Sequence, residues 1–115
     1  MQVTRIDEAK PYEAAGHYEV GCLRLQGHEA SETDNFWCGL SYYLPGGRAE
    51  MAGSPFEKVY VMIEGELTII TEEGETVLGP LDSCHIAPSE ARAVENRTNR
   101  VASMLVTVPN KPVQS

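Results

Sequence analysis

The stretch PGGRAEMAGSPFEKVYVMIEGEL, residues 45–67, decides how the chain folds. It opens with the sequence PGG, which predicts a turn at residues 45–47, and continues through a polar loop into an alternating segment. There Lys58, Tyr60 and Met62 share one face of a predicted strand, because side chains alternate along an extended backbone. The sequence EGE at residues 64–66 predicts a second turn, so the stretch indicates a β-hairpin.

Period-two patterns of apolar residues also mark the rest of the chain. We expect further strands near residues 19–27, 36–44, 67–71, 76–78, 84–87, 92–96 and 101–109, separated by segments rich in turn residues. No segment has the period of an amphipathic helix. Eight or so short strands without helices predict an all-β fold, an antiparallel barrel or jelly roll that closes on itself and hides its edges.

The size and composition of the chain limit the classes of protein to which it can belong. A length of 115 residues predicts one domain with one site. We expect a barrel core at about residues 18–108, an irregular lead at residues 1–17 and a polar tail at residues 109–115. The net charge of −8 argues against nucleic acid as a partner, because phosphates are bound through clustered Lys and Arg.

Signals for membranes, secretion and disulfides are missing from the pattern. No apolar run approaches the roughly 20 residues that cross a bilayer. The N-terminal segment MQVTRIDEAKPYEAAG carries charges throughout and lacks the apolar core of a signal peptide. Three widely spaced cysteines without a C-x-x-C motif predict reduced thiols. These features predict a cytoplasmic protein without a membrane partner.

The central stretch resembles the first conserved motif of the cupin family, G-x5-H-x-H-x3-E-x6-G. When the last glycine of this motif is placed on Gly65, the first falls on Gly46 without a gap. The second motif, G-x5-P-x-G-x2-H-x3-N, places its asparagine on Asn96, and the resemblance covers about residues 36–108. It implies a small, single-domain cupin-2 type jelly-roll barrel, the antiparallel double-stranded β-helix.

The usual metal ligands of the family are replaced in this sequence. The positions of the first two histidines and the glutamate fall on Ala52, Ser54 and Lys58, and the position of the last histidine falls on Arg92. In the metal-binding members, imidazoles and a carboxylate hold a divalent cation. Two cationic side chains repel such an ion, so the alignment implies a cupin without the usual metal and without another cofactor.

Lys58 and Arg92 need negative charge near them if they share a cavity, because an unpaired buried charge costs several kcal/mol. Within the chain, the candidates to pair with them are Glu50, Glu57 and Asp82. An internal ion pair of this kind would close the barrel without a ligand. The other source of negative charge is a small anionic metabolite, for which Arg offers a bidentate fork and Lys a point charge.

These residues define a predicted site. The expected catalytic residues are Lys58, Arg92, Tyr60 and Glu57. The expected ligand-binding residues are Lys58, Arg92, Ser54, Met51 and Glu50. In such a site the two cations stabilise a developing enolate, while a glutamate acts as base and the Tyr60 hydroxyl donates a proton. In a variant of this hypothesis, Lys58 forms a Schiff base with the substrate.

Three functions from different classes remain open. The first is a metal-free cupin that binds an anionic metabolite and catalyses proton transfer, isomerisation or decarboxylation. The second is a metal-dependent dioxygenase or isomerase with displaced ligands, for which His85, Glu50 and Glu57 form an alternative metal site. The third is a non-catalytic accessory or regulatory module.

Other residues are expected on the outside of the barrel. His17 and His28 lie in polar segments, which predicts that they are exposed. Val59, Val61 and Ile63 alternate with the inward-facing residues of their strand and form an apolar outer face. Small cupins commonly form homodimers, so the resemblance implies a homodimer built through this face and the N-terminal lead.

Overall fold

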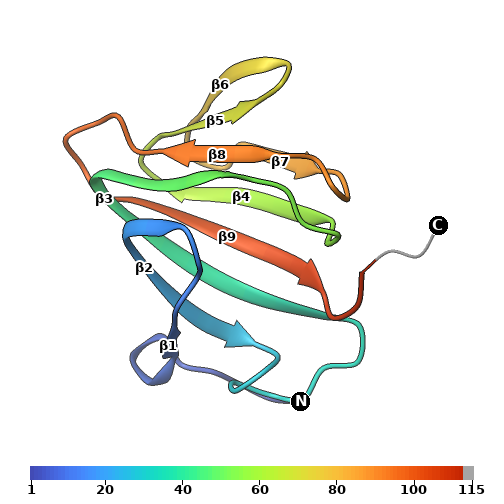
Figure 1. Ribbon diagram of the computed structural model, residues 1–115. Coiled ribbons are helices and arrows are strands. Elements are labelled where there is room, and N and C mark those ends of the chain that lie inside the picture. Colours follow the sequence, from blue (N-terminus) through green and yellow to red (C-terminus); the bar gives the residue numbers. More distant parts are fainter. Residues whose placement is uncertain (113–115) are drawn as a thin grey trace.

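The computed structural model describes residues 1–112 and shows an almost entirely β-stranded molecule (Figure 1). One short 3₁₀ turn, η1 (Ile6–Glu8), comes first. The strands that follow are β1 (Lys10–Tyr12), β2 (His17–Gln26), β3 (Phe36–Ala52), β4 (Lys58–Glu64), β5 (Leu67–Thr71), β6 (Gly74–Leu78), β7 (Ser83–Ile86), β8 (Arg92–Glu95) and β9 (Ala102–Pro109). The all-β prediction is therefore confirmed.

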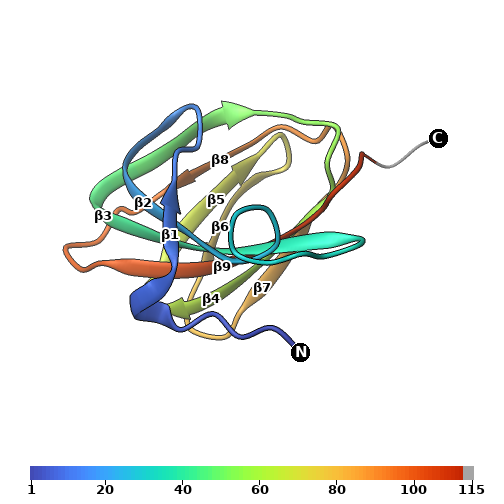
Figure 2. The same ribbon diagram turned by 90° about the horizontal axis from the view of Figure 1, so that it is seen from below.

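The long strand β3 joins the two halves of the molecule. Along one edge, its residues 36–43 pair with β9 and its residues 48–52 pair with β8. Along the other edge it pairs with β2. The strand order is β6-β5-β8-β3-β9-β4-β7, with β1 and β2 beside β3, and neighbouring strands run antiparallel. The sheet curves around a common interior and forms a nearly closed barrel (Figure 2).

The turn predicted at residues 45–47 is wrong, because β3 continues through them to Ala52. Gly46 has a left-handed conformation, with φ at +82°, and its N–H donates to the backbone oxygen of Asn96 at 3.0 Å. The N–H of Asn96 donates in turn to the oxygen of Gly47 at 2.9 Å. Glycine therefore bends the strand while its hydrogen bonding continues, and most of the predicted polar loop is strand.

The bend predicted at residues 64–66 is confirmed, but the hairpin is not. Gly65 has φ at +76°, and a Cβ atom on it would lie 2.9 Å from the Cα of Ala102, so only glycine fits there. The strands on either side pair with different neighbours: β4 pairs with β7 and β9, whereas β5 pairs with β6 and β8. The chain therefore crosses from one part of the strand order to another at this bend.

The predicted alternation along β4 is confirmed by burial. Tyr60 and Met62 are 3% and 0% exposed, whereas Val59 and Ile63 are 39% and 37% exposed. The inner residues pack in a core that also contains Met104 of β9. In the part of the chain that is described, no helix has the length and apolar character that crossing a membrane requires.

The N-terminal lead is more ordered than predicted. β1 pairs with β2, placing Tyr12 opposite Cys22 and Pro11 opposite Leu23. Proline is compatible with this position because β1 is an edge strand, where an N–H is not needed on the open side. The lead therefore adds a strand that carries Tyr12 to the interior, whereas the end of the predicted polar tail, residues 113–115, lies outside the described residues.

Candidate functional site

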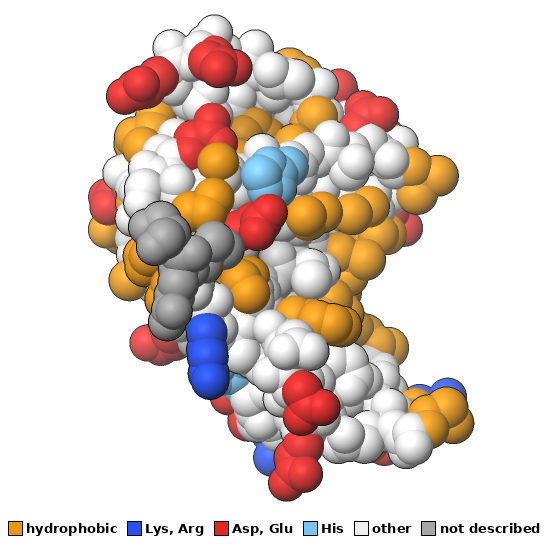
Figure 3. Space-filling view, turned by 90° about the vertical axis from the view of Figure 1, so that its right-hand side faces the viewer, with side chains coloured by type: hydrophobic (Ala, Val, Ile, Leu, Met, Phe, Trp, Pro, Cys, Tyr) orange, Lys and Arg blue, Asp and Glu red, His pale blue; other side chains and the backbone are white. Residues whose placement is uncertain are grey.

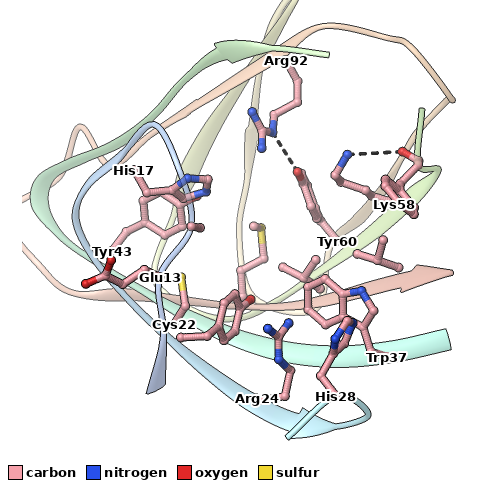
Figure 4. Close-up of a pocket in the computed structure, with 16 residues that line it drawn as sticks. Glu13, His17, Cys22, Arg24, His28, Trp37, Tyr43, Lys58, Tyr60 and Arg92 are labelled. Atoms are coloured by element: carbon pink, nitrogen blue, oxygen red, sulfur yellow. Dashed lines mark hydrogen bonds between the residues drawn. The ribbon is translucent and has the colours of Figure 1, made fainter. Parts of the chain in front are cut away.

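A cavity of about 400 Å³ lies inside the barrel (Figure 4), a volume within the usual range for small-molecule sites. The aromatic residues that line it are Tyr12, Trp37, Tyr43, Phe56 and Tyr60. Three long cationic side chains, those of Arg24, Lys58 and Arg92, also line it. Glu13 is the one Asp or Glu side chain among the described lining residues. The cavity is thus aromatic and carries an excess of positive charge.

Of the four positions that match the metal ligands of cupins, Lys58 and Arg92 line this cavity, whereas Ala52 and Ser54 lie beside them outside its lining. Ala52 and Arg92 are register partners between β3 and β8. The Nζ of Lys58 donates to the Oγ of Ser54 at 2.6 Å and to the backbone oxygen of Phe56 at 3.3 Å. The chain therefore presents a methyl, a hydroxyl, an ammonium and a guanidinium group. These groups do not fit a divalent cation, because two of them are cations themselves.

Lys58 and Arg92 face the cavity, and neither forms an ion pair with a carboxylate of residues 1–112. Burial lowers the pKa of Lys58 below its ordinary value, and the positive charge of Arg92 lowers it further. The Nε of Arg92 donates to the Tyr60 hydroxyl at 2.8 Å, and its Nη1 donates to the backbone oxygen of Glu50 at 3.2 Å. The internal ion pair considered above is not formed, so two like charges lie near each other without a carboxylate.

The Tyr60 hydroxyl lies between the apolar interior and Arg92. Burial raises the pKa of Tyr60, and the charge and hydrogen bond of Arg92 oppose that rise. Burial also raises the pKa of the neighbouring Tyr43, which is 1% exposed. Both phenols are therefore protonated at neutral pH, and Tyr60 is placed to donate a hydrogen bond to a ligand beside the guanidinium.

The three carboxylates expected to pair with the cations lie elsewhere. The Oε1 of Glu57 is 2.7 Å from the Nε2 of His85 on the outer surface, where these side chains are 45% and 52% exposed. Asp82 accepts a hydrogen bond from a backbone N–H at 2.9 Å. Glu50 offers Arg92 its backbone oxygen alone. The structure therefore does not bring Glu57 to the other predicted catalytic residues, because it precedes Lys58 and points to the opposite face.

The remaining predicted contacts divide in the same way. Ser54 contacts Lys58, as described above, but both Ser54 and Met51 lie outside the residues that line the cavity, and Met51 is 51% exposed. His85 and Glu57 are not joined by Glu50. Across residues 1–112, no group of three or more His, Cys, Asp or Glu side chains is placed to hold a metal ion, so the alternative ligand set is not assembled.

His17, predicted at the surface, is half-buried and lines the cavity, whereas His28 lines it and is exposed, as predicted. The Nδ1 of His17 is 2.9 Å from the backbone oxygen of Ala15. Burial lowers the pKa of His17, the hydrogen bond that it donates to the Ala15 oxygen raises it, and the charge of Arg92 lowers it again. His17 is therefore neutral at pH 7 and can accept a proton. His17 is half-buried and Glu13 is exposed, so the two bring acid–base groups from the N-terminal segment to the edge of the cavity.

The far side of the cavity is built from β1, β2 and the start of β3. The Cζ of Arg24 lies 3.7 Å from the ring centre of Tyr12 and 4.5 Å from that of Trp37. Figure 4 shows Arg24 and Arg92 reaching the cavity from opposite sides. Burial is the main cause of a raised pKa at Tyr12, so its hydroxyl stays protonated.

The alternation of side chains along β2 could have predicted one of these cavity residues, Arg24. Cys22 and Arg24 are two residues apart in a strand, so the apolar character of Cys22 places Arg24 on the inner face as well. Glu13 and His17 had no such signal, because their position depends on the pairing of β1 with β2. Local alternation cannot predict which strand becomes a neighbour.

The outer surface differs from the cavity in charge. Figure 3 shows acidic side chains spread over the upper and lower parts of one face, with hydrophobic side chains gathered between them. The chain carries 17 Asp and Glu residues against 9 Lys and Arg residues. Three of those nine cations nevertheless line the cavity. The positive charge inside is therefore a local feature of the site.

Known proteins resemble this chain in sequence and in structure. No protein-family model matches it. The chain is 52% identical, over 108 residues, to the Mycobacterium tuberculosis protein named beta-D-galactosidase Rv1717, and the match covers 94% of this chain and 93% of that protein. Identity at this level over nearly the whole length shows that the two belong to one family.

Solved structures identify the fold. The polyketide cyclase RemF of Streptomyces resistomycificus superposes with a TM-score of 0.87 at 16% identity, covering 99% of this chain and 82% of that chain. A predicted oxalate decarboxylase of Thermotoga maritima gives a TM-score of 0.79 at 20% identity, covering 95% and 98%. A cupin-2 domain protein of Rhodospirillum rubrum gives 0.81 at 13% identity, covering 99% and 78%. The chain therefore has the fold of a small cupin, and it belongs to the family of the mycobacterial protein named beta-D-galactosidase Rv1717.

Proposed function

We propose that this cupin binds a small acidic sugar derivative in its cavity without the metal that cupins commonly use. The observation that carries the proposal is that Lys58 and Arg92 face one cavity without a carboxylate partner among the described residues. A carboxylate or phosphate of a ligand would supply the missing negative charge, with Arg92 as a fork and Lys58 as a point charge. The name of the relative at 52% identity supports a sugar as the rest of the ligand.

The same charges favour reactions in which negative charge develops. In an isomerisation or decarboxylation, Lys58 and Arg92 would stabilise an enolate oxygen, and the Tyr60 hydroxyl would donate to it. Glu13 and His17 replace Glu57 as candidates for the base, because both line the cavity whereas Glu57 pairs with His85 outside it. Burial and Arg92 lower the pKa of Lys58, and a lowered pKa favours the Schiff-base role, because that role needs the neutral amine. The electrostatic role needs the protonated ammonium group instead.

Hydrolysis of a β-D-galactoside is a second candidate, because the relative carries that name. Most glycosidases use two carboxylates and pass through an oxocarbenium-like, positively charged transition state. The cavity offers Glu13 as its one described carboxylate and places two unpaired cations opposite. This arrangement destabilises such a transition state, so hydrolysis would depend on Glu13 as the proton donor.

Thermal unfolding with a ligand panel tests the binding proposal. D-galacturonate, D-gluconate and inorganic phosphate are compared with neutral D-galactose for the wild type and for Lys58→Met and Arg92→Met. The acids should raise the unfolding midpoint of the wild type, since a ligand at 100 times its Kd adds about 2.7 kcal/mol. The rise should disappear in both variants and persist in Arg97→Met, a control on the outer surface. If no acid stabilises the wild type, the proposal is wrong.

Release of galactose from methyl β-D-galactoside tests the second candidate. Measured with wild type and Glu13→Gln, hydrolysis should be detectable and lost in the variant if this reaction is correct. If the wild type binds galacturonate but releases no galactose, hydrolysis is excluded and binding of an acidic sugar derivative stays the proposed function. Activity that persists in Glu13→Gln would exclude the assigned proton donor.

A further inference from the structure

The end of the cavity around Arg24 differs in chemistry from the end around Lys58 and Arg92. Besides Arg24 it contains Tyr12 and Trp37, whose rings meet edge to face with centres 5.8 Å apart. His28 packs edge to face on Trp37 at 5.5 Å. The rings of Tyr12 and Trp37 thus flank one guanidinium group, and this arrangement offers flat apolar surfaces beside N–H donors.

Arg24 brings hydrogen-bond donors to this end of the cavity without adding net charge, because it pairs with Glu29. Its Nε donates to the Oε1 of Glu29 at 2.7 Å, and the two form an ion pair. Neither Nη nitrogen donates to another residue within the described chain. The side chain of Arg24 is only 11% exposed, so these N–H groups are held in a restricted space. A neutralised guanidinium suits hydroxyl oxygens, whereas an unpaired one suits an anion.

Gly39 makes room for this arrangement. It is the register partner of Arg24 across the β2–β3 pair. A Cβ atom at Gly39 would lie 2.8 Å from the Tyr12 hydroxyl oxygen and 3.1 Å from the Cζ3 of Trp37. Any other residue would therefore displace one of the rings, because contacts that short are rarely tolerated.

We propose that Tyr12, Arg24 and Trp37 form a ring subsite that binds the neutral, polyhydroxylated ring of the ligand. The C–H face of a sugar ring would pack on the aromatic surfaces, and its hydroxyl oxygens would accept from the Nη groups of Arg24. The acidic group would then lie at Lys58 and Arg92. This inference rests on the proposed function and deepens it: the ligand is a sugar derivative whose ring and acid occupy opposite ends of the cavity.

The intrinsic fluorescence of Trp37 tests the ring subsite, because Trp37 is the single tryptophan of the chain. Methyl β-D-galactoside and D-galacturonate are titrated against wild type, Arg24→Met, Lys58→Met and the control Arg97→Met. Both sugars should change the Trp37 emission of the wild type. Arg24→Met should weaken both by about tenfold, the equivalent of about 1.4 kcal/mol of lost hydrogen bonding. Lys58→Met should weaken galacturonate alone.

Arg24→Lys provides a second variant that keeps the charge and most of the apolar stem but removes the planar fork. It should weaken methyl β-D-galactoside to a similar extent. Unchanged emission at saturating sugar, or affinities within twofold of wild type in both Arg24 variants, would overturn the ring subsite. Failure of the proposed function has a different signature, since galacturonate then gives no stabilisation and Lys58→Met has no effect. A wild type that binds neither sugar overturns both proposals.

Discussion

Arg92 and Arg97 lie five residues apart, one at the start of β8 and one just beyond its end, yet their surroundings are opposite. Arg97 donates from both Nη atoms to Glu75, at 2.7 and 3.0 Å, and from Nε to Glu95 at 2.6 Å, on the outer surface. Arg92 faces the cavity and meets a phenol and a backbone oxygen. One arginine has two carboxylates, and the other has none among the described residues.

The comparison shows where the chain leaves a charge available. Surface pairs such as Arg97 with Glu75 contribute little, because water screens both partners. Acidic residues are abundant in the sequence, so a partner for Arg92 could have been present at small cost. Lys58 and Arg92 instead remain together in a partly buried space, where uncompensated charge is unfavourable. That cost is expected where a ligand supplies the opposite charge.

The largest expected difference between the two arginines concerns ligand affinity after charge reversal. In Arg92→Glu, the new carboxylate faces Lys58 and occupies the place proposed for the acid, so the affinity for galacturonate should fall by about 100-fold or more, or more than about 2.7 kcal/mol. Arg97→Glu should leave the affinity within about twofold. Isothermal titration calorimetry measures both. Equal losses in the two variants would show that Arg92 acts through the fold and not through the ligand.

The next difference concerns stability. Arg92→Met leaves the buried Tyr60 hydroxyl without its partner, which should lower the free energy of unfolding by about 1–3 kcal/mol. In the double variant with Tyr60→Phe, part of this loss should return, because the polar group without a partner is gone. Urea denaturation measures the three proteins. A double variant that is less stable than Arg92→Met would contradict the explanation.

A smaller effect is expected from His17, which shares the cavity with Arg92. Because its folded-state pKa is below the ordinary value of 6.5, the unfolded chain takes up the proton first. The contribution of His17 to stability is therefore complete above pH 6.5 and is lost as pH falls through the lower folded-state pKa. Unfolding midpoints between pH 7.5 and 5 should show a decline that His17→Gln reduces. An identical decline in the variant would assign it to other groups.

The smallest effect is expected at Arg97. Its ion pairs are fully solvated, so Arg97→Gln should lower the unfolding midpoint only slightly in dilute buffer. At 1 M NaCl the difference from wild type should vanish, because salt screens exposed charges. A loss that persists in high salt would mean that Arg97 contributes through packing, and the comparison with Arg92 would be weaker.

The sequence allowed prediction of those features that depend on local alternation. The inward face of Lys58, Tyr60 and Met62 follows from period two, and the bend at Gly65 follows from its residue type. Of the four positions matching the metal ligands of cupins, Lys58 and Arg92 line the cavity and Ala52 and Ser54 do not. The roles of Lys58 and Arg92 toward a ligand remain predictions.

The features that escaped prediction depend on pairing between distant segments. Pro45 and the two glycines after it suggested a turn, whereas hydrogen bonds to Asn96 keep the strand continuous. Glu13 and His17 line the cavity because β1 pairs with β2, and nothing in a three-residue segment indicates that pairing. The opposite location of Glu57 was predictable in principle, since it adjoins the inward-facing Lys58.

The continuity of β3 has a consequence for the size of molecule that fits. Gly39, opposite Arg24, and Ala52, opposite Arg92, belong to this one strand, so a single stretch of backbone spans both ends of the cavity. Each residue of a strand advances by about 3.3 Å. The length of β3 between Gly39 and Ala52 therefore sets the distance between the two ends of the cavity. Adding or removing residues between these two positions would alter the length of the compound that can reach both ends at once.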